Sequence, residues 1–400
     1  MYLRSIQLEN YRNYRRLDID VEPSINVFFG QNAQGKTNIV EAIYLCACAR
    51  SHRTSKDRDL IFHGENYYKV ALSLVSERNS EEYEESVSLL YADEDGKKAK
   101  RTAYQDGVPF EKISDYLGIF HAVIFAPEDL QLVKEGPSVR RRYLDILISQ
   151  VKPSYFHLLM TYSRLLLQRN KVLKNLKLRG GPHRLSSEEE KELEIWDYPL
   201  AESGARIIAD RIRFSERVKQ IAKLKHSQIS EEKEILTVKY RTVSGILSDA
   251  VLSDSYQHAG EIEKLLLNKL LNSHQEDYDK GTTYFGPHRD DVELLLNNEN
   301  LRLFASQGQQ RSAALSLKLA ELVILREETK EMPILLLDDV FSELDEKRRA
   351  CLLENIENAQ VFVTCTDRFF LETLLSKWNR VQEGKIAFFE VSEGSVNRLS

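Results

Sequence analysis

The sequence predicts an α/β protein with a mixed sheet that is interrupted along the chain by a helical subdomain. A glycine-rich phosphate loop lies between an apolar run and a helical pattern near the N-terminus. Strand and helix patterns alternate near both ends of the chain, and residues 138–230 between them have helical periodicity. We therefore expect residues 1–137 and 231–400 to form one α/β domain, with 138–230 as a helical arm subdomain.

Short apolar runs dominate the first 130 residues. Strands are predicted over 2–8, 17–21, 25–29 and 121–125, with a helix over 37–49. Three further alternating runs, 69–75, 86–91 and 99–105, are separated by turn residues and predict an antiparallel sheet. Pro127 is expected to open a helix.

The insert predicts two long helices. Pro153 should break or kink the first one, and residues 180–182 form a turn. Ser187, followed by Glu190, is typical of a capping box at the start of the second helix. Two interpretations stay open: a projecting antiparallel arm, or a helical subdomain without projection.

The last third of the chain returns to strand and helix patterns. The predicted elements are a strand at 236–240, a helix at 259–273, a hairpin at 291–304 around Asn297-Asn298, a helix at 306–326, and buried strands at 333–338 and 360–364.

The phosphate loop is the clearest candidate site. It has the pattern G-x-x-x-x-G-K-T between a strand and a helix. Backbone N–H groups and the helix N-terminus can cradle phosphates, Lys36 can reach the terminal phosphates, and Thr37 can take one Mg²⁺ position. The candidate nucleotide ligands are Gly30, Gln31, Asn32, Ala33, Gln34, Gly35, Lys36, Thr37 and Asn38.

A second candidate half-site ends the strand at 334–337. Asp338 and Asp339 follow it directly. An apolar strand that delivers two carboxylates to a sheet edge is the usual partner of a phosphate loop. We expect Asp338 to hold the Mg²⁺ shell and Asp339 to orient or deprotonate the attacking water, with Lys36 as the other catalytic residue.

Composition limits the kinds of partner. The chain has 62 acidic and 56 basic residues, so any nucleic-acid surface must be a local patch. Candidate basic clusters are Lys97, Lys98, Lys100 and Arg101; Arg140, Arg141 and Arg142; and Arg164, Arg169, Lys171, Lys174, Lys177 and Arg179. A solvated helix face is the alternative for each cluster. The four cysteines fit no zinc or disulfide pattern, and neither a signal peptide nor an apolar span is evident, so we expect an intracellular protein.

The order of these motifs resembles the ABC-type ATPase head of SMC-like DNA repair proteins. A Ser-x-Gly-Gln segment at 306–309 precedes the paired acids, Ser-x-Leu-Asp follows them, and Thr366 stands where many ABC heads carry a histidine. In that family, the signature of one subunit caps the γ-phosphate held by the other. The resemblance implies an ATP-bound homodimer, with Ser306, Gly308, Gln309 and Thr366 among the nucleotide contacts.

Longer segments resemble the RecF family of bacterial recombination mediators. They are GQNAQGKTNIVEAIYL, PEDLQLVKEGPSVRRRYLD, YFGPHRDD, SQGQQRSAALSLKLAEL and ILLLDDVFSELD. The resemblance implies ATP-dependent binding to duplex DNA near single-strand gaps, help in loading the RecA recombinase, and RecR and RecO as partners. It also implies a weak Mg²⁺-dependent ATPase and a place in the cytoplasm with the nucleoid.

Some positions depart from the wider ABC pattern. Asp339 replaces a longer glutamate, and Gln307 replaces a glycine. No Q-loop glutamine is evident, and Glu128 or Gln131 is expected to serve near the metal. These departures favour slow turnover that works as a switch.

Several roles stay open. His288 and Arg289 form either a plain turn or a support for the nucleotide site or the dimer contact, and Arg12 is either a nucleotide contact or a surface arginine. A nuclease-associated ABC ATPase and a transporter ATPase subunit are the competing functions. The short segment after Asp345 argues against the first, and the Gly-Pro-His-Arg segment and the helical insert argue against the second.

Overall fold

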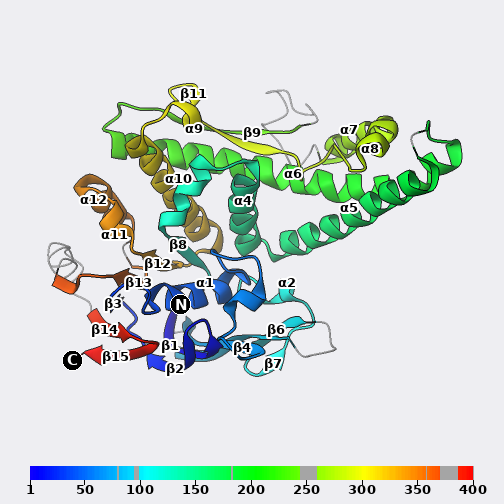
Figure 1. The fold of residues 1–400 in the computed structure, drawn as a ribbon. Helices are drawn as coiled ribbons and strands as arrows, with labels where there is room; N and C mark the ends of the chain where they lie inside the picture. Colours follow the sequence, from blue (N-terminus) through cyan, green and yellow to red (C-terminus); the bar gives the residue numbers. More distant parts are fainter. Residues whose placement is uncertain are drawn as a thin grey trace. The chain divides into compact units, whose positions relative to one another are not determined.

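The structure is a computed structural model that describes residues 1–78, 81–93, 99–181, 183–243, 259–356, 358–369 and 386–399. Lys97 and Lys98 of the first basic cluster, and Pro182 of the expected turn, lie outside the described residues. The chain forms two compact units (Figure 1). Unit 1 contains Met1–Leu130, Lys225–Glu232 and Arg311–Ser400, and unit 2 contains Gln131–Leu224 and Lys233–Gln310.

Unit 1 is built on two six-stranded sheets. The antiparallel sheet has the order β2 (Tyr14–Asp20), β1 (Tyr2–Tyr11), β4 (Tyr67–Arg78), β5 (Glu81–Ala92), β6 (Lys100–Gln105), β7 (Val108–Pro109). The mixed sheet has the order β15 (Ser395–Leu399), β14 (Ile386–Ser392), β3 (Ile25–Phe29), β13 (Val361–Cys365), β12 (Ile334–Asp338), β8 (Ala122–Phe125). Only the β14–β15 pair of the mixed sheet is antiparallel.

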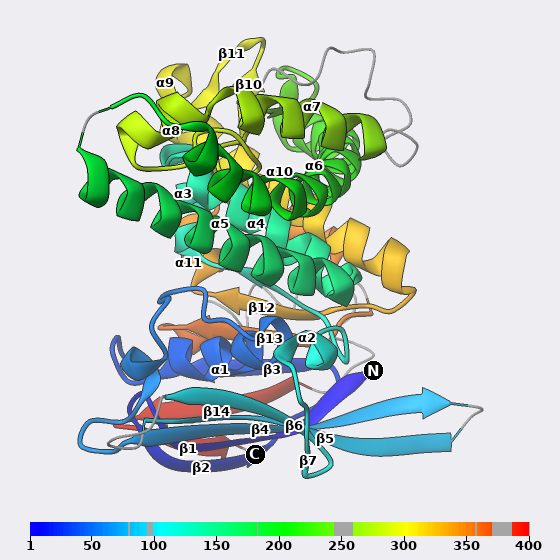
Figure 2. The same ribbon diagram turned by 90° about the vertical axis from the view of Figure 1, so that its right-hand side faces the viewer.

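Helix α1 (Lys36–Cys48) packs on strands of both sheets and lies between them (Figure 2). Burial on both sides explains why the helix is mostly apolar, since every residue from Ile39 to Cys48 is buried. The central strands β12 and β13 are buried throughout, which is why their sequences are continuous apolar runs rather than alternating ones. The other helices in the described part of unit 1 include α2 (Ile113–Tyr116), most of α10 (Gln307–Thr329), α11 (Val340–Glu343), α12 (Glu346–Asn355) and the 3-10 turns Asp57–Leu60 and Pro127–Leu130.

Unit 2 is mainly helical. The helices in its described residues are α3 (Gln131–Lys134), α4 (Pro137–Val151), α5 (Pro153–Gly180), most of α6 (Ser187–Ser230), α7 (Ala259–Asn272), α8 (His274–Lys280) and α9 (Leu301–Phe304). A small antiparallel sheet joins β9 (Leu236–Arg241), β10 (Asp291–Leu296) and β11 (Glu299–Asn300). The break between α4 and α5 falls at Lys152, directly before Pro153, as the sequence predicted.

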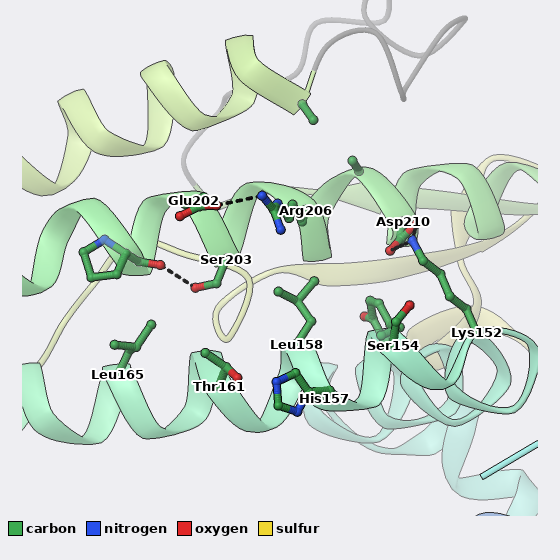
Figure 3. Close-up of a pocket in the computed structure, with 14 residues that line it drawn as sticks. Lys152, Ser154, His157, Leu158, Thr161, Leu165, Glu202, Ser203, Arg206 and Asp210 are labelled. Carbon is green, nitrogen blue, oxygen red and sulfur yellow. Dashed lines mark hydrogen bonds and ion pairs between the residues drawn. The ribbon is translucent and has the colours of Figure 1, made fainter. Parts of the chain in front are cut away.

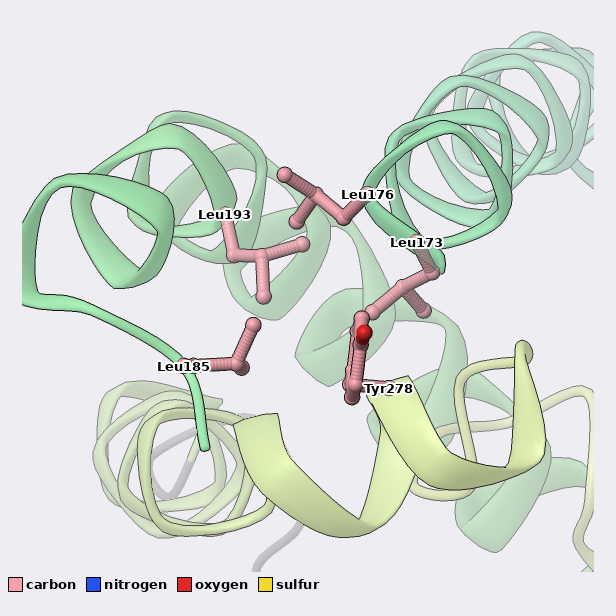
Figure 4. Close-up of a cluster of buried hydrophobic side chains, with 5 residues drawn as sticks. All are labelled: Leu173, Leu176, Leu185, Leu193 and Tyr278. Atoms are coloured by element: carbon pink, nitrogen blue, oxygen red, sulfur yellow. The ribbon is translucent and has the colours of Figure 1, made fainter. Parts of the chain in front are cut away.

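The helical hairpin is not a bare pair of helices. Leu173 and Leu176 of α5, Leu185 of the turn and Leu193 of α6 form a buried cluster with Tyr278 of α8 (Figure 4). Contacts of this kind place residues 233–310 in the same unit as the helices, whereas we expected residues 231–400 to belong to the α/β domain. These contacts join segments far apart in the chain, so no local pattern predicts them.

Two local expectations differ from the structure by a few residues. The capping box at the start of α6 uses Ser186 and Glu189, one residue earlier than expected: the Glu189 N–H donates to Ser186 Oγ, and the Ser186 N–H donates to Glu189 Oε2. The hairpin around Asn297-Asn298 ends at Asn300, because the Asn300 side chain accepts the N–H groups of Arg302 and Leu303 and starts α9 there.

Candidate nucleotide-binding site

Three chain segments meet at one edge of the mixed sheet. Strands β3, β13 and β12 are parallel neighbours, with Phe29 opposite Cys365 and Thr364 opposite Asp338. Their carboxyl ends therefore bring the phosphate loop, Thr366 and the paired acids to the same edge, which is where open α/β sheets bind ligands. The sequence predicted each part, and the strand order brings these parts together.

The phosphate loop has the backbone geometry that its glycines allow. Gly30 and Gly35 have φ values of 150° and 116°, and Ala33 is left-handed with φ 66°. Gln31, Asn32 and Ala33 form the exposed crest of the loop. Lys36 Nζ folds over the loop and donates to the carbonyl oxygens of Gly30 (2.6 Å) and Gln31 (2.7 Å).

Thr37 and Asp338 lie directly against each other. Thr37 Oγ1 donates to Asp338 Oδ1 at 2.9 Å, and Thr364 Oγ1 donates to the same oxygen at 2.6 Å. Thr364 Oγ1 also accepts the Asp339 N–H at 2.9 Å. Thr364 thus orients both acids, a role the sequence analysis did not assign; the parallel register of β12 and β13 is the signal that could have shown it.

Asp339 has a left-handed backbone, with φ 50°. Non-glycine residues in this region are uncommon and gather at functional sites. The negative charge of Asp339 acts on Lys36, whose pKa is nevertheless lowered because burial outweighs the attraction of the nearby acids. The paired acid and the loop lysine therefore share one electrostatic environment.

The oxygen groups around Asp338 fit a divalent cation. Burial raises the pKa of Asp338 despite the two threonine hydrogen bonds, and the charge of Glu128 raises it further. Glu128 Oε2 is buried and has no hydrogen-bond partner among the residues that the structure describes. Two carboxylates, one of them with an orphaned oxygen, and a threonine hydroxyl form the hard oxygen set that Mg²⁺ prefers. Of the two Q-loop candidates, Glu128 is the one whose charge acts on Asp338.

Asn38 joins the loop to neighbouring segments that the sequence did not single out. Asn38 Nδ2 donates to Asn13 Oδ1 at 2.8 Å, and Asn13 Nδ2 donates to the Gln34 carbonyl at 2.9 Å. The Glu393 N–H donates to Gln34 Oε1 at 2.6 Å, which ties the loop to the β14–β15 turn. The β14–β15 hairpin was not predicted, although Ala387, Phe389 and Val391 show the alternation of a strand.

Arg12 is engaged within the protein. Its guanidinium makes two hydrogen bonds, of 2.8 and 2.7 Å, to the carboxylate of Glu41, which is fully buried in α1. Such a bidentate pair is geometrically specific. Arg12 therefore holds the loop helix to β1.

The signature segment lies at the start of α10. The Ser306 N–H donates to Gln309 Oε1 at 2.7 Å, and the Gln309 N–H donates to Ser306 Oγ at 3.3 Å, which is a capping box. Ser306 is exposed, and Gly308 is partly exposed. Thr366 is also exposed, just past β13.

His288 and its loop are held on several sides within unit 2. Tyr162 Oη contacts His288 Nδ1 at 2.7 Å, and Nε2 contacts the Thr283 carbonyl at 3.1 Å, so Nε2 carries the proton and donates. Burial lowers the pKa of His288 to about 4, so the ring is neutral. Arg140 pairs with Asp291, Arg141 donates to the Asp290 carbonyl, and Arg211 donates to the Pro287 carbonyl.

Two other findings concern metal sites and membrane-spanning helices. No group of three or more His, Cys, Asp or Glu side chains within the described ranges could hold a metal by itself. No helix in the described part of the chain has the length and apolar character to cross a membrane.

Comparison with known proteins identifies the family. The model of the RecF/RecN/SMC N terminal domain matches residues 2–385. The DNA replication and repair protein RecF of Acetivibrio thermocellus is 43% identical over 372 residues, 93% of this chain and 95% of that protein. The RecF protein of Halothermothrix orenii is 42% identical over 399 residues, 100% of this chain and 99% of that protein.

Solved structures agree with the sequence comparison. A structure of the recombination mediator protein RecF with ATP in the RecFOR pathway has a TM-score of 0.85 and 36% identity, and covers 100% of this chain and 98% of that one. The Smc head domain of Pyrococcus furiosus, at a TM-score of 0.51 and 15% identity, shares the fold. The expected ABC-type α/β head is confirmed. The chain belongs to the RecF family.

Proposed function

We propose that this protein is an ATP-dependent DNA-binding protein of recombinational repair that dimerises around ATP. The observation that carries the proposal is the meeting of the phosphate loop, Thr37 and Asp338 at one sheet edge, with the 2.9 Å contact between Thr37 and Asp338. A RecF protein that is 36% identical to this chain has been solved with ATP, which supports the same ligand here.

Each site residue has a chemical task in this proposal. Loop N–H groups and Lys36 bind the phosphates, and Thr37, Asp338 and Glu128 would hold Mg²⁺, which supplies charge neutralisation at the phosphates. Asp339 orients the attacking water. Ser306, Gly308 and Gln309 of a second copy present a capped helix N-terminus to the γ-phosphate, and Thr366 contributes a polar contact beside it.

The biological role follows from the family. The relatives are DNA replication and repair proteins, and the solved RecF structures belong to the RecFOR pathway. We infer that the ATP-bound dimer acts at duplex DNA beside single-strand gaps in the cytoplasm, with RecR and RecO as partners, and helps to load RecA. Hydrolysis is slow and resets the dimer, so a steady-state rate as fast as a translocase's would contradict the switch.

Two variants test the nucleotide arrangement. Lys36→Ala should remove both ATP binding and ATP-induced dimerisation. Ser306→Arg should keep ATP binding in the monomer, because it leaves the phosphate loop intact, but should block the dimer. Light scattering with and without Mg-ATP, together with a nucleotide-binding assay, separates the two. Normal dimerisation of Ser306→Arg would show that the shared-nucleotide arrangement is wrong.

A further inference from the structure

Helix α5 has an unusual charge composition. Its 28 residues include no aspartate or glutamate, yet they contain Arg164, Arg169, Lys171, Lys174, Lys177 and Arg179. Arg169 is the exception among these cations, because it is fully buried and pairs with Asp197 (2.6 Å) and Asp277 (2.7 Å). The other five are exposed.

Six of the exposed residues of α5 follow one line along the helix. Residues 160, 164, 167, 171, 174 and 178 are spaced alternately by four and three, which keeps them on a single face. They are Met160, Arg164, Leu167, Lys171, Lys174 and Leu178, and we name them the outer stripe. The buried residues Tyr162, Arg169, Leu173 and Leu176 lie on the opposite face.

The cations of the outer stripe have no acidic partner. No ion pair or hydrogen bond of Arg164, Lys171 or Lys174 occurs within the described ranges of the chain, and the same holds for Arg179. The pocket of about 620 Å³ between α5 and α6 differs from the outer stripe, because its cations are paired with acids (Figure 3). Its Lys152 pairs with Asp210, and its Arg206 pairs with Glu202.

In the Arg140–Arg142 cluster of unit 2, two of the cations are engaged within the chain. Arg140 is bound by Asp291, and Arg141 donates to the Asp290 carbonyl. Among the described residues of unit 2, the outer stripe is therefore a line of exposed cations that remains open to an external anion.

Geometry favours an extended polyanion as that partner. From Arg164 to Arg179 the helix rises by roughly 22 Å, at about 1.5 Å per residue. Phosphates of duplex DNA repeat about every 3.4 Å along each strand, so the spread-out cations can meet several of them. Two copies of α5 cannot pair through the stripe, because Arg164, Lys171 and Lys174 would repel their counterparts. Arg179 is also exposed but lies beside the outer stripe, so the basic surface is wider than the single line of residues that a paired helix would contact.

We propose that the outer stripe of α5 binds the phosphate backbone of duplex DNA without reading its sequence. This inference rests on the proposed DNA-binding function and assigns it a surface. Leu167 and Leu178, which are 67% and 84% exposed, lie between the cations and take no part in the phosphate contacts.

The test is a salt titration of duplex binding. Full-length protein with Mg-ATP is titrated against a fluorescein-labelled duplex of about 40 base pairs, by anisotropy, between about 50 and 200 mM KCl. Lys171→Gln/Lys174→Gln should weaken binding on the order of tenfold at about 100 mM KCl, and should reduce the slope of log K against log salt by about 2, since each phosphate contact contributes about 0.9. Glutamine keeps the helix intact.

Two further variants make the result specific. Lys191→Gln/Lys264→Gln removes two exposed lysines elsewhere in unit 2 and should leave both affinity and slope unchanged. Leu167→Gln/Leu178→Gln should also bind like the wild type, and a loss there would contradict a phosphate-only contact. ATP-induced dimerisation should persist in all three variants.

The outcomes separate this inference from the proposed function. If the wild type binds duplex and Lys171→Gln/Lys174→Gln has the wild-type slope, the outer stripe does not bind DNA, and an acidic partner protein is the remaining occupant. If the wild type binds no duplex with Mg-ATP, the proposed function itself fails.

Discussion

Gly30 and Gly35 are the positions of the phosphate loop where an added side chain would meet close neighbours, a backbone carbonyl at Gly30 and two side chains at Gly35. A Cβ on Gly30 would collide with the backbone carbonyl oxygen of Val391, and one on Gly35 would lie 2.6 Å from Asn13 Nδ2 and 2.7 Å from Tyr14 Oη. Both glycines also have positive φ. The loop shape thus depends on the β14–β15 hairpin and the β1–β2 turn as well as on its own sequence.

Gly30→Ala should lower ATP affinity at least tenfold. The loop must move away from Val391, and its N–H groups then no longer point at the phosphates. Isothermal titration with ATP measures this. Gly107→Ala is the matched control: Gly107 also has positive φ, 78°, but a Cβ there meets nothing within 4 Å. The control should destabilise the fold by about 1 kcal/mol and leave ATP affinity unchanged. Equal ATP affinities in the two variants would contradict the steric argument.

Asp290 gives unit 2 a measurable pH dependence. It is 1% exposed, accepts Tyr240 Oη at 2.6 Å and the Val243 N–H at 3.2 Å, and faces Arg141 and Arg211. Burial raises its pKa to about 6. A raised acid pKa means that the folded state binds the proton more tightly, so this stabilisation is complete below about pH 4 and is lost as pH rises through about 6.

Asp290→Asn should remove that dependence. The difference in unfolding free energy between wild type and variant should fall by up to about 3 kcal/mol from pH 4 to 7, at about 1.4 kcal/mol per pKa unit. Urea denaturation at several pH values measures it. A difference that stays constant with pH would show that Asp290 titrates normally.

At the scale of elements, α8 closes the end of the α5–α6 hairpin. Tyr278 is 1% exposed and packs on four leucines, and its hydroxyl donates to the Gly181 carbonyl. Arg169 of α5 ties the same region together through Asp197 of α6 and Asp277 of α8. Apolar packing and a buried ionic network therefore act on the same three helices.

Tyr278→Ala should destabilise the protein by about 3–5 kcal/mol, since it removes a buried aromatic ring from a closed cluster. Tyr278→Phe should lose only about 1 kcal/mol, the typical value of one hydrogen bond. Tyr198→Ala, at a position that is 56% exposed on α6, is the surface control and should change stability by less than about 0.5 kcal/mol. Thermal or urea unfolding gives all three values. A Tyr278→Ala value near that of the control would mean that α8 does not support the hairpin.

For the whole molecule, the proposed sharing of ATP between two copies predicts a concentration effect. The phosphate loop lies in unit 1, and Ser306 lies in unit 2. Hydrolysis at saturating ATP should rise with the square of protein concentration at low concentration, because each active site needs a second copy. Turnover per chain that is independent of dilution would contradict this arrangement. A mixture of dilute wild-type protein with excess Lys36→Ala protein gives a further check. The Lys36→Ala copy cannot bind ATP itself, but its Ser306 can still cap the ATP held by a wild-type copy, so hydrolysis per wild-type chain should rise.

Features that depend on residues close together in the sequence were predicted, and features that depend on distant residues were not. Strands β1 to β6, helix α1 and the break before Pro153 were predicted, because periodicity, proline and turn residues act locally. The β14–β15 hairpin was missed, although it pairs directly with β3 and contacts the loop at Gln34. The basic clusters show the same limit, since only the fold reveals that Arg140 and Arg169 pair with acids far away in the chain and that Arg141 donates to a distant carbonyl.

By itself, the sequence determined the phosphate loop, the paired acids, the alternation of strands and helices, and the family, because these depend on residue types at short spacings. Tertiary structure alone decided that Thr364 orients both Asp338 and Asp339, that the charge of Glu128 acts on Asp338, and that the outer face of α5 carries exposed cations without an ion pair to any described residue. The physical reason is that the order of the parallel strands and long-range packing decide which distant polar groups come into contact. The spacing of residues along the chain does not show which of these groups will meet.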